Sequence, residues 1–377
     1  MWRAFHDAWW RLATQSHPQS FLDVLACRAL QIGSAAYQAA VTLRNLAYDR
    51  GLAPQVRLPC RVVSVGNLTV GGTGKTTCVE FVARKLQAMG KRVAVLSRGY
   101  GGMRRDYWLR TDSGRLLVNG EPIAAHDGLA DEPQLLAEHL DGVPVLVGRR
   151  RDRTGRVAAS QFGVETVILD DGFQHRRLAR DCDIVLIHAR MPFGGWPVLP
   201  RGPMREPLSA LSRAHVMIIT KADEALGTLG ALAERLRSLN PDAAVLTAVH
   251  EPSALQDAMT EQPLDLSRLE GLRVGLVSSI GDPDGFEATV QRLHATVAWH
   301  RAFPDHHRYQ AAEWAALQRT PGTRPAAIVT TEKDWLRLKP VAGRDQLEVP
   351  LWVVRVRLRI LTGESLLDDR LAGVHAR

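Results

Sequence analysis

The segment Asn67–Thr77, with the sequence NLTVGGTGKTT, constrains the fold more than any other part of this chain. It follows the apolar run Val62–Val65 and precedes CVEFVARKLQAMG, a pattern typical of a strand, a glycine-rich loop and a helix. Glycines allow backbone N–H groups to turn toward phosphate oxygens, and the N-terminus of the following helix adds a partial positive charge. The segment therefore predicts a nucleotide-phosphate loop at the end of a buried strand.

The loop departs from the full phosphate-loop pattern GxxxxGK[ST] at one position, where Thr69 replaces the first glycine. Lys75 is placed to reach the β- and γ-phosphates, and the Thr76 hydroxyl to ligate Mg²⁺. A glycine-rich turn without a ligand is the alternative, and the strand–loop–helix context disfavours it. The predicted nucleotide-binding residues are Thr69, Val70, Gly71, Gly72, Thr73, Gly74, Lys75, Thr76 and Thr77.

Apolar strand patterns alternate with helical patterns from residue 61 onward, which indicates an α/β fold. Most of these apolar runs are continuous rather than alternating, as expected for a parallel sheet covered on both faces. Ligands of such sheets bind at the carboxyl ends of the strands, so the residues after each strand are site candidates. The predicted strands are Arg61–Val65, Arg92–Leu96, Val143–Val147, Thr166–Leu169, Ile184–Ile187 and Val216–Ile219.

At 377 residues the chain exceeds the usual size of a single hydrophobic core, so two domains are expected. We predict a core over residues 51–255 that resembles the parallel-sheet domain of P-loop NTPases. A second, smaller α/β domain is predicted over residues 256–377, where RVGLVSSIG, AAIVTTEKD and LWVVRVRLRI occur. The polar stretch SALQDAMTEQPLDLSRLEG near the boundary is interpreted as a connector.

Residues 1–50 form a separate N-terminal region in which apolar residues recur at helical spacing. One interpretation is a helix that packs on the domain behind it. The other is an amphipathic helix in the headgroup layer of a membrane, with tryptophans and arginines at the water boundary. No uncharged apolar run of about 18 residues occurs, so no transmembrane helix is predicted. The region begins with the aromatic residues Trp2, Phe5, Trp9 and Trp10.

The chain carries a net charge of +8, from 48 basic and 40 acidic residues. This excess favours an anionic partner, such as nucleic acid, a phosphorylated substrate or a membrane surface, without choosing between them. The four cysteines form no CxxC pair and no metal-like spacing, which indicates a reduced, cytosolic compartment. Composition therefore limits the partners but not the reaction.

A nucleotide site needs an acidic side chain at the end of a second strand, and Asp170 and Asp171 directly follow the run Val167–Leu169. One of these carboxylates is expected to hold Mg²⁺, directly or through water. The polar start of a loop is the alternative explanation for both residues. The predicted metal ligands are Thr76, Asp170 and Asp171.

Three further segments follow predicted strands. SRGYGG, with Arg98 and Tyr100, follows the second strand. GRRRDR follows the third strand, and alone it is more typical of a solvated basic face than of a site. MPFGGWPVLPRGPMREP follows the Ile184–Ile187 strand and places Arg205 and Glu206 in a loop stiffened by proline and glycine.

Two more motifs combine acids with proline or histidine. The motif DEP at Asp131 is most simply a helix start, with an acidic cap and a proline in the first turn. In AFPDHHRY, Asp305, His306 and His307 resemble metal ligands, but adjacent histidines on an extended chain point to opposite sides. A carboxylate–histidine pair is the better interpretation, and a buried structural histidine remains the alternative.

In this order, the segments resemble one family closely, the tetraacyldisaccharide 4′-kinases of lipid A biosynthesis. The resemblance implies phosphorylation of the 4′-hydroxyl of a tetraacylated glucosamine disaccharide 1-phosphate by ATP and Mg²⁺, which gives lipid IVA. It also implies a peripheral enzyme on the cytoplasmic face of the inner membrane, and we expect a monomer that binds no nucleic acid. The matching pieces, from residue 64 to residue 334, are SVGNLTVGGTGKT, LSRGYGG, DEPQLLA, LDDGFQHRRLARD, LPRGPMREPL, FPDHHRY and VTTEKD.

The resemblance assigns roles to individual residues as well. Asp131 is the expected base for the sugar hydroxyl, with His306 as its partner and Asp305 supporting the histidine. Lys75 and Arg205 are expected to neutralise charge on the transferring group. The residues expected to line the transfer site or to contact the substrate are Arg98, Tyr100, Gln174, His175, Arg205 and Glu206.

Two other classes share parts of this pattern. A partition-type positioning ATPase also uses GGxGKTT, but it carries a lysine just before the two glycines, where this chain has Val70. A GTP-dependent switch would explain Lys221-Ala-Asp223 as part of a guanine-reading NKxD, yet Thr220 replaces the asparagine. A short polar turn explains the same residues. Turnover of GTP against ATP, and dependence on a lipid acceptor, separate these classes from a kinase.

Overall fold

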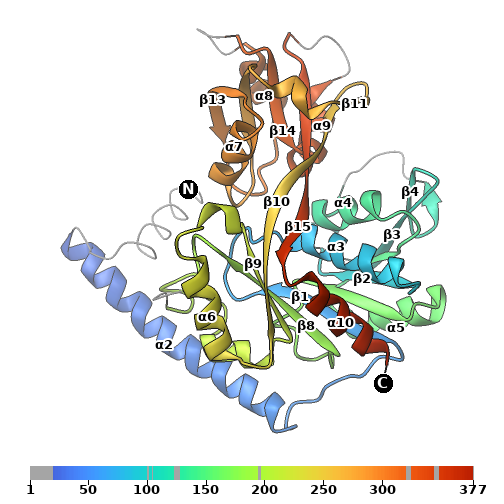
Figure 1. Cartoon of the computed structure of the whole chain (residues 1–377), viewed down its shortest axis with the longest axis vertical. Helices are drawn as coiled ribbons and strands as arrows, with labels where there is room; N and C mark the ends of the chain where they lie inside the picture. The colour runs from blue at the N-terminus through green and yellow to red at the C-terminus, as the bar shows by residue number, and fades with distance from the viewer. Residues whose placement is uncertain are drawn as a thin grey trace. The chain divides into compact units, whose positions relative to one another are not determined.

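The computed structural model consists of two compact units, and Figure 1 traces the chain through them. The first unit comprises the residues up to Val249 together with Arg359–Arg377, and the second comprises His250–Leu358. The structure describes residues 20–99, 102–103, 105–122, 128–193, 197–319, 324–343 and 348–376. Tyr100 and the aromatic residues Trp2, Phe5, Trp9 and Trp10 lie outside these ranges.

A parallel sheet forms the centre of the first unit, as the continuous apolar runs predict. Its residues are almost all buried on both faces, because helices pack against the sheet. Neighbouring strands follow the order β9 (Val216–Thr220), β8 (Cys182–His188), β1 (Arg61–Asn67), β7 (Thr166–Asp170), β2 (Val93–Ser97) and β6 (Val145–Val147). The phosphate-loop segment therefore follows a central strand, with the strand of Asp170 beside it.

Two helices pack on these central strands. Helix α3 (Lys75–Ala88) begins directly after the glycine loop and packs on β1, β2 and β7. Helix α5 (Arg151–Phe162) packs through Ala158 on the sheet face that carries Val62, Leu96 and Leu169. The cover over β8 and β9 comes from η1 (Leu208–Arg213) and α6 (Leu229–Leu239). Between them, η2 (Ala222–Glu224) is the short turn after β9.

Beyond β6 the sheet continues as an antiparallel meander, which the sequence analysis did not predict. It consists of β3 (Tyr107–Asp112), β4 (Arg115–Val118) and β5 (Glu121–Pro122). Buried and half-buried residues alternate along β3, so only one of its faces is fully covered. Helix α4 (Asp131–His139) packs on β3 and β6.

A long helix, α2 (Phe21–Asp49), lies along the first unit (Figure 1). It begins after Ser20, whose hydroxyl accepts a hydrogen bond from the Asp23 N–H. One side of α2 packs on the unit and buries Cys27, Ser34, Val41 and Asn45. None of the helices in the described part of the chain has the length and apolar character that a membrane crossing requires.

The second unit is built on a smaller parallel sheet, as predicted for this part of the chain. Its strand order is β13 (Thr296–Ala302), β12 (Arg273–Ser278), β14 (Ala327–Thr331) and β15 (Leu351–Thr362). Two separate core clusters show that both faces of this sheet are covered. The remaining elements are η3 (Leu266–Leu269), α7 (Pro283–Gln291), α8 (Ala311–Gln318) and α9 (Glu332–Ala342).

The chain passes between the units along two strands rather than through a connector. The SALQD part of the expected connector continues strand β10 (Ala244–Asp257), which pairs with β11 (Pro263–Leu264). This interpretation was therefore wrong. Backbone pairing and a fully buried Leu255 stabilise this polar stretch as a strand.

The last residues return to the first unit, which the predicted range 256–377 did not anticipate. After β15, helix α10 (Glu364–His375) contacts β8. Lys85 Nζ on α3 lies 2.7 Å from Glu364 and 2.6 Å from Asp368 on α10. The predicted boundary near residue 255 lies close to the first passage, between Val249 and His250.

Candidate active site

The glycine loop takes the backbone path that its sequence predicts. Gly71 has φ of 113° and Gly74 has φ of 80°, in the region that L-residues with side chains avoid. Gly74 is the N-cap of α3, so the first backbone N–H groups of the helix face the loop. Asn67 Nδ2 donates to Thr73 Oγ1 at 2.9 Å, and Thr77 Oγ1 donates to the Gly74 carbonyl at 2.9 Å. These contacts fix the loop between β1 and α3.

A short backbone ladder explains why Thr69 can replace the first glycine of the pattern. Val70 N donates to the Pro203 carbonyl at 2.8 Å, and Arg205 N donates to the Leu68 carbonyl at 2.7 Å. Thr69 pairs with Met204 as an isolated antiparallel bridge. Thr69 does not adopt a positive φ here, so no glycine is required. The same ladder brings Arg205 to the phosphate loop.

Lys75, Asp171 and Arg205 form a charged cluster at this edge of the sheet. Arg205 Nη1 donates to both carboxylate oxygens of Asp171 at 2.8 Å. Lys75 Nζ lies 3.7 Å from Asp171 Oδ1 and 3.5 Å from Asn67 Oδ1. Burial alone would raise the pKa of Asp171, but Lys75 and Arg205 hold it below its usual range. Two cations and one carboxylate thus meet where a polyphosphate is expected.

The backbone at Asp171 is strained. Its φ of 50° places a residue with a side chain in the left-handed region. The following Gly172 has no room for a Cβ, which would lie 2.8 Å from Ser64 Oγ. Such strain is common at functional sites, where the surrounding structure holds a residue in an unfavourable conformation. Here it turns Asp171 from the end of β7 toward Lys75.

Asp170 occupies a different environment from Asp171. It is only 3% exposed, and its carboxylate accepts a hydrogen bond of 3.0 Å from Ser97 Oγ at the end of β2. Burial, followed by the negative charges of Glu132 and Asp171, raises the pKa of Asp170 to about 7. Glu132 in the first turn of α4 was not predicted as a site residue. In the sequence, only its position beside Pro133 in the DEP motif could have indicated a role for Glu132.

The donor set around Asp170 and Asp171 fits a magnesium ion shared with a nucleotide. All the predicted ligands are oxygen atoms, and the negative charges of Glu132 and Asp171 both act on Asp170. Within the described ranges, no group of three or more His, Cys, Asp and Glu side chains could hold a metal alone. A nucleotide-bound Mg²⁺ needs few protein ligands, because phosphates and waters complete its octahedron. Thr76, Asp170 and Asp171 remain the predicted ligands.

Two arginines extend the cationic part of this edge. Arg151, the first residue of α5, is 5% exposed and donates from Nη2 to the Asp170 carbonyl at 3.0 Å. Burial lowers the pKa of Arg151, while Asp170 and Asp171 oppose that effect. Arg98 after β2 is exposed and adds a repulsive charge near Arg151. The GRRRDR segment thus contributes one buried arginine to the site.

Gln174 and His175 follow Asp171 on a tight turn. Gln174 Nε2 donates to the Asn67 carbonyl at 3.0 Å, which joins this turn to the end of β1. Burial, followed by the charges of Arg151 and Arg180, lowers the pKa of His175 to about 4. His175 is therefore neutral at physiological pH. Most of the charges that act on it are cationic, and Asp152 opposes them in part.

The His175 environment predicts a pH-dependent loss of stability. Because its folded pKa lies below the unfolded value of 6.5, its contribution is complete above about pH 6.5 and falls as the pH drops toward 4. When the pH is lowered from about 7.5 to about 4.5, the unfolding free energy of the parent should fall more than that of His175→Gln. The difference should be ~1–2 kcal/mol after allowance for solvent screening. Urea titrations at both pH values measure this difference. Equal losses would contradict the assignment.

The Glu206 side chain contacts helix α2 and η1. It is fully buried and accepts hydrogen bonds from Arg44 at 3.1 Å, Asn45 at 2.9 Å and Arg213 at 2.8 Å. Arg205, in contrast, binds Asp171 beside the glycine loop. Glu206 instead connects α2 to η1.

Asp131 is the first residue of α4, and Ala130 rather than an acidic residue is the N-cap. The structure confirms a helix start with proline in the first turn, but not an acidic cap. The negative charge of Asp131 acts on Tyr107, whose pKa is raised chiefly by burial. Glu132, the next residue of this turn, acts on Asp170 beside the phosphate loop.

Asp305 and His306 belong to the second unit. His306 Nε2 lies 3.9 Å from Asp305 Oδ1, which is too long for a hydrogen bond. His306 has φ of 61°, so the segment is not extended as assumed. The two histidines nevertheless have different partners, because His307 Nε2 lies 2.9 Å from Glu313 Oε2. A metal-like arrangement, which the sequence analysis set aside, does not occur among the described residues of this segment.

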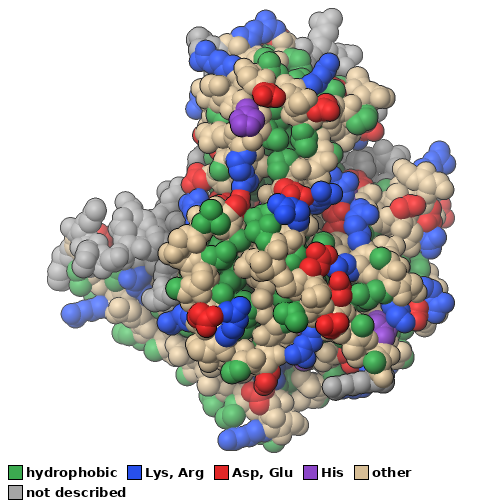
Figure 2. All heavy atoms as spheres, in the orientation of Figure 1, with side chains coloured by type: hydrophobic (Ala, Val, Ile, Leu, Met, Phe, Trp, Pro, Cys, Tyr) green, Lys and Arg blue, Asp and Glu red, His purple; other side chains and the backbone are tan. Residues whose placement is uncertain are grey.

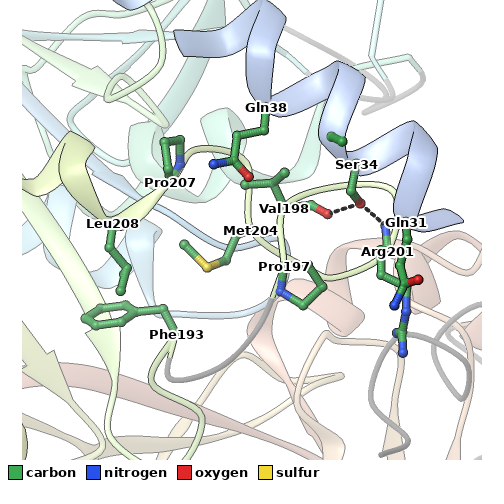
Figure 3. A pocket seen from close by; sticks show the side chains of 11 residues that line it. Gln31, Ser34, Gln38, Phe193, Pro197, Val198, Arg201, Met204, Pro207 and Leu208 are labelled. Atoms are coloured by element: carbon green, nitrogen blue, oxygen red, sulfur yellow. Dashed lines mark hydrogen bonds between the residues drawn. The ribbon is translucent and has the colours of Figure 1, made fainter. Parts of the chain in front are cut away.

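A pocket of about 700 Å³ opens between α2 and the loop that carries Arg205 (Figure 3). Ser34 Oγ donates to the Val198 carbonyl at 2.7 Å and accepts from Arg201 N at 2.8 Å. Tyr37 Oη donates to the Arg205 carbonyl at 3.0 Å. The side chains that line the pocket include Gln31, Gln38, Phe193, Met204 and Leu208. Helix α2 and the Arg205 loop therefore form one hydrogen-bonded structure.

The parallel sheet, the glycine loop after β1 and the carboxylates after β7 define a P-loop nucleotide-binding enzyme. A profile of the family described as tetraacyldisaccharide-1-P 4'-kinase matches residues 26–375. The chain belongs to this family and is a kinase that uses ATP and Mg²⁺. This result confirms the resemblance seen in the sequence and excludes a GTP-dependent switch and a positioning ATPase.

Individual relatives agree with the family assignment. A tetraacyldisaccharide 4'-kinase of Anaeromyxobacter dehalogenans (strain 2CP-C) is 44% identical over 371 residues, 97% of this chain and 93% of the relative. That of Syntrophus aciditrophicus (strain SB) is 41% identical over 345 residues, 89% of this chain and 90% of the relative. A crystal structure of LpxK from Aquifex aeolicus in complex with ATP is 26% identical, with a TM-score of 0.69 over 93% of this chain and 99% of that chain.

Proposed function

We propose that this kinase transfers the γ-phosphate of ATP to the 4′-hydroxyl of a tetraacylated glucosamine disaccharide 1-phosphate. The product would be lipid IVA, an intermediate of lipid A biosynthesis. The cluster of Lys75, Arg205 and Asp171 beside the glycine loop carries the proposal. Phosphoryl transfer depends mainly on positioning and charge neutralisation, and this cluster supplies both.

Each charged group has a proposed part in the reaction. Lys75 and Arg205 bind the oxygens of the transferring phosphoryl group and stabilise its negative charge. Asp171 holds both cations in place before the nucleotide binds, since it contacts each of them. A bound Mg²⁺, held by Thr76, Asp170 and Asp171, would neutralise phosphate charge. Arg98 and Gln174 are proposed to orient the substrates at the same edge.

The acceptor hydroxyl needs a base, because a sugar hydroxyl is a poor nucleophile until it loses its proton. Asp131 is the proposed base, as it begins a helix beside the buried carboxylate cluster. His306 is proposed to assist Asp131, although it belongs to the second unit. Asp305, at 3.9 Å from His306 Nε2, is proposed to act on the histidine through its charge alone.

The direct test is transfer of label from γ-labelled ATP to purified disaccharide 1-phosphate in detergent micelles. We expect label in the lipid product with ATP, little with GTP, and no comparable nucleotide consumption without the acceptor. A disaccharide in which the 4′-hydroxyl is replaced by hydrogen serves as the matched control. Transfer to this control would contradict the proposed acceptor atom.

Helix α2 is proposed to bind the cytoplasmic surface of the inner membrane without crossing it. At about 100° per residue, Leu25, Ile32 and Leu43 fall within about 20° of one another on the helix surface. They are 58%, 74% and 66% exposed, on the side opposite to buried Ser34 and Val41. A stripe of exposed apolar side chains fits the hydrocarbon boundary of a bilayer. The protein is proposed to act there as a peripheral monomer.

On the face of the protein drawn in Figure 2, the arrangement of charges does not favour a nucleic-acid partner. Figure 2 shows basic and acidic side chains interspersed over the face drawn there. Nucleic-acid binding usually places basic residues in a patch or stripe. We therefore propose that the net charge of +8 serves the phosphorylated lipid and the membrane surface.

Replacement of the apolar stripe tests the membrane proposal. The triple variant Leu25→Gln/Ile32→Gln/Leu43→Gln should bind liposomes at least ~10-fold more weakly, because three side chains lose their transfer into lipid. Its unfolding transition should be nearly unchanged, since all three side chains are exposed. Co-flotation with phosphatidylethanolamine–phosphatidylglycerol liposomes measures the difference. Leu226→Gln, at a leucine that is 74% exposed outside α2, is the matched control. Equal flotation of the triple variant and the parent would assign α2 a purely structural role.

A further inference from the structure

The motif VTTEKD has no role in the proposed chemistry, yet its last residue organises a buried polar network in the second unit. Asp334 is fully buried at the start of α9. It accepts hydrogen bonds from Ser279 N at 2.8 Å, Ser279 Oγ at 2.5 Å and Tyr309 Oη at 3.0 Å. Thr331 Oγ1 lies 2.7 Å from its other oxygen. A carboxylate buried with this many donors is held in one position.

Arg337, one turn further along α9, connects this network to His306. Its side chain is 6% exposed, and Nη1 lies 3.7 Å from Asp334 Oδ1. The same nitrogen donates to Ser279 Oγ at 2.8 Å and to the Ser279 carbonyl at 3.1 Å. Its second nitrogen, Nη2, lies 3.1 Å from His306 Nδ1. The rigid guanidinium therefore spans from the Asp334 network to the histidine ring.

The contact between Arg337 and His306 has only one consistent assignment of hydrogens. A guanidinium group donates hydrogen bonds and cannot accept them, so His306 Nδ1 must be the acceptor. A neutral imidazole with an accepting Nδ1 carries its hydrogen on Nε2. The backbone is fixed as well, because His306 N donates to the Ser279 carbonyl at 3.2 Å. Ser279 thus anchors both the main chain of His306 and the arginine that binds its ring.

Charged groups lie on both sides of the ring. Arg337 occupies the Nδ1 side, whereas Asp305 lies 3.9 Å from Nε2. Lys333 Nζ, also on α9, lies 3.8 Å from the same carboxylate oxygen of Asp305. The His306 side chain is 35% exposed.

We infer that Arg337 is a positioning residue that fixes the tautomer and orientation of His306, with Nε2–H as the group available to the reaction. This inference rests on the proposed function of His306. In this arrangement Nε2–H donates to a carboxylate or phosphate oxygen. Asp334, Ser279 and Tyr309 hold the arginine in place. The VTTEKD and FPDHHRY motifs thereby form one structural element.

The tautomer is measured directly by NMR of protein with ¹⁵N-labelled histidine. The His306 signals are identified by comparison with His306→Ala. We expect an unprotonated Nδ1 and a protonated Nε2 in the parent. In Arg337→Met the ring should populate both tautomers, because the donor to Nδ1 is lost. Unchanged ring-nitrogen signals in Arg337→Met would overturn the inference, whatever the activity of the enzyme.

Kinetics provide the second measurement. Arg337→Met should lower kcat on the order of 10- to 100-fold, because misplacing a catalytic group typically slows the reaction by about this factor. KM for ATP should be nearly unchanged. Arg337→Lys keeps a cationic donor and should recover part of the loss. In the His306→Ala background, Arg337→Met should have little further effect. An equal loss in both backgrounds would show that Arg337 acts on something other than His306.

A matched control separates positioning from folding. Thr331→Val removes a hydrogen bond to Asp334 and the cap of α9, but Thr331 has no hydrogen bond to His306 among the contacts described. It should lower the unfolding temperature while kcat at about 25 °C stays near that of the parent. If Thr331→Val lowers kcat as much as Arg337→Met, general loosening of the unit explains both and the inference fails. If His306→Ala is fully active, the proposed function of His306 fails, while the NMR result still decides the contact with Arg337.

Discussion

Lys75→Met is expected to lower kcat by ~10²–10³-fold or more, since one preorganised cation at the transferring group is worth about this much. The ammonium group lies 3.7 Å from Asp171 and 3.5 Å from Asn67, so it is already held at the phosphate loop before a nucleotide binds. Steady-state transfer of labelled phosphate measures the loss. The unfolding transition should stay close to that of the parent, because Arg205 still pairs with Asp171.

The matched control for Lys75→Met is Lys339→Met in the second unit. Lys339 also pairs with one carboxylate, that of Glu261 at 2.9 Å, but its side chain is 39% exposed at the surface of α9. Its replacement should leave transfer unchanged. Near-normal turnover of Lys75→Met would rule out the glycine loop as the ATP site, and an equal loss in both variants would indicate a general effect of charge.

Asp131→Asn is expected to lower kcat by ~10²–10⁴-fold, the usual value of general-base assistance. The amide keeps the shape of the side chain and the start of α4, but it cannot accept the proton of the sugar hydroxyl. ATP binding should be nearly unchanged, since the proposed role concerns the acceptor alone. Nucleotide affinity and kcat are therefore measured on the same preparations. If Asp131→Asn raises KM for the lipid and leaves kcat unchanged, Asp131 acts in substrate binding instead.

The coupling between Asp131 and His306 is tested by a double-variant cycle. His306→Ala should lower kcat by a substantial part of the fall expected for Asp131→Asn. In the double variant Asp131→Asn/His306→Ala, kcat should fall by much less than the product of the two single-variant factors. Such non-additivity is the mark of residues that act in one step. Fully multiplicative losses would show that the two residues act independently.

The sequence predicted the parallel sheets and the glycine loop because their signals are local. A continuous apolar run specifies a strand buried on both faces, and Gly71 and Gly74 specify backbone conformations that few other residues adopt. The meander from Tyr107 to Pro122 was missed because it packs on one face only. Its alternating pattern is weaker and resembles that of a polar loop.

The candidate site was less accessible to sequence reasoning, because it depends on pairing between distant segments. Arg205 and Glu206 are adjacent, and the sequence does not show which of them faces the glycine loop. The ladder between Leu68 and Arg205 decides this, and it directs Glu206 to Arg44 and Asn45 instead. Glu132 was missed for the same reason, since its influence on Asp170 arises from the packing of α4.

The two interpretations of the N-terminal helix are compatible in the structure. One side of α2 packs through Ser34 and Val41, as expected for a helix on the domain behind it. The other side presents Leu25, Ile32 and Leu43, as expected for an interfacial helix. Apolar spacing alone could not distinguish these cases, because both sides of the helix contribute to the pattern.

The attachment of α2 to the Arg205 loop has a consequence for how the enzyme meets its substrate. Ser34 and Tyr37 hydrogen-bond to that loop, so if α2 rests on a bilayer as proposed, it keeps Arg205 at a fixed depth relative to the lipid surface. The search for the acceptor then takes place in two dimensions. We expect the rate to follow the mole fraction of acceptor in mixed micelles, so that added inert detergent slows transfer by surface dilution even when the bulk acceptor concentration is constant.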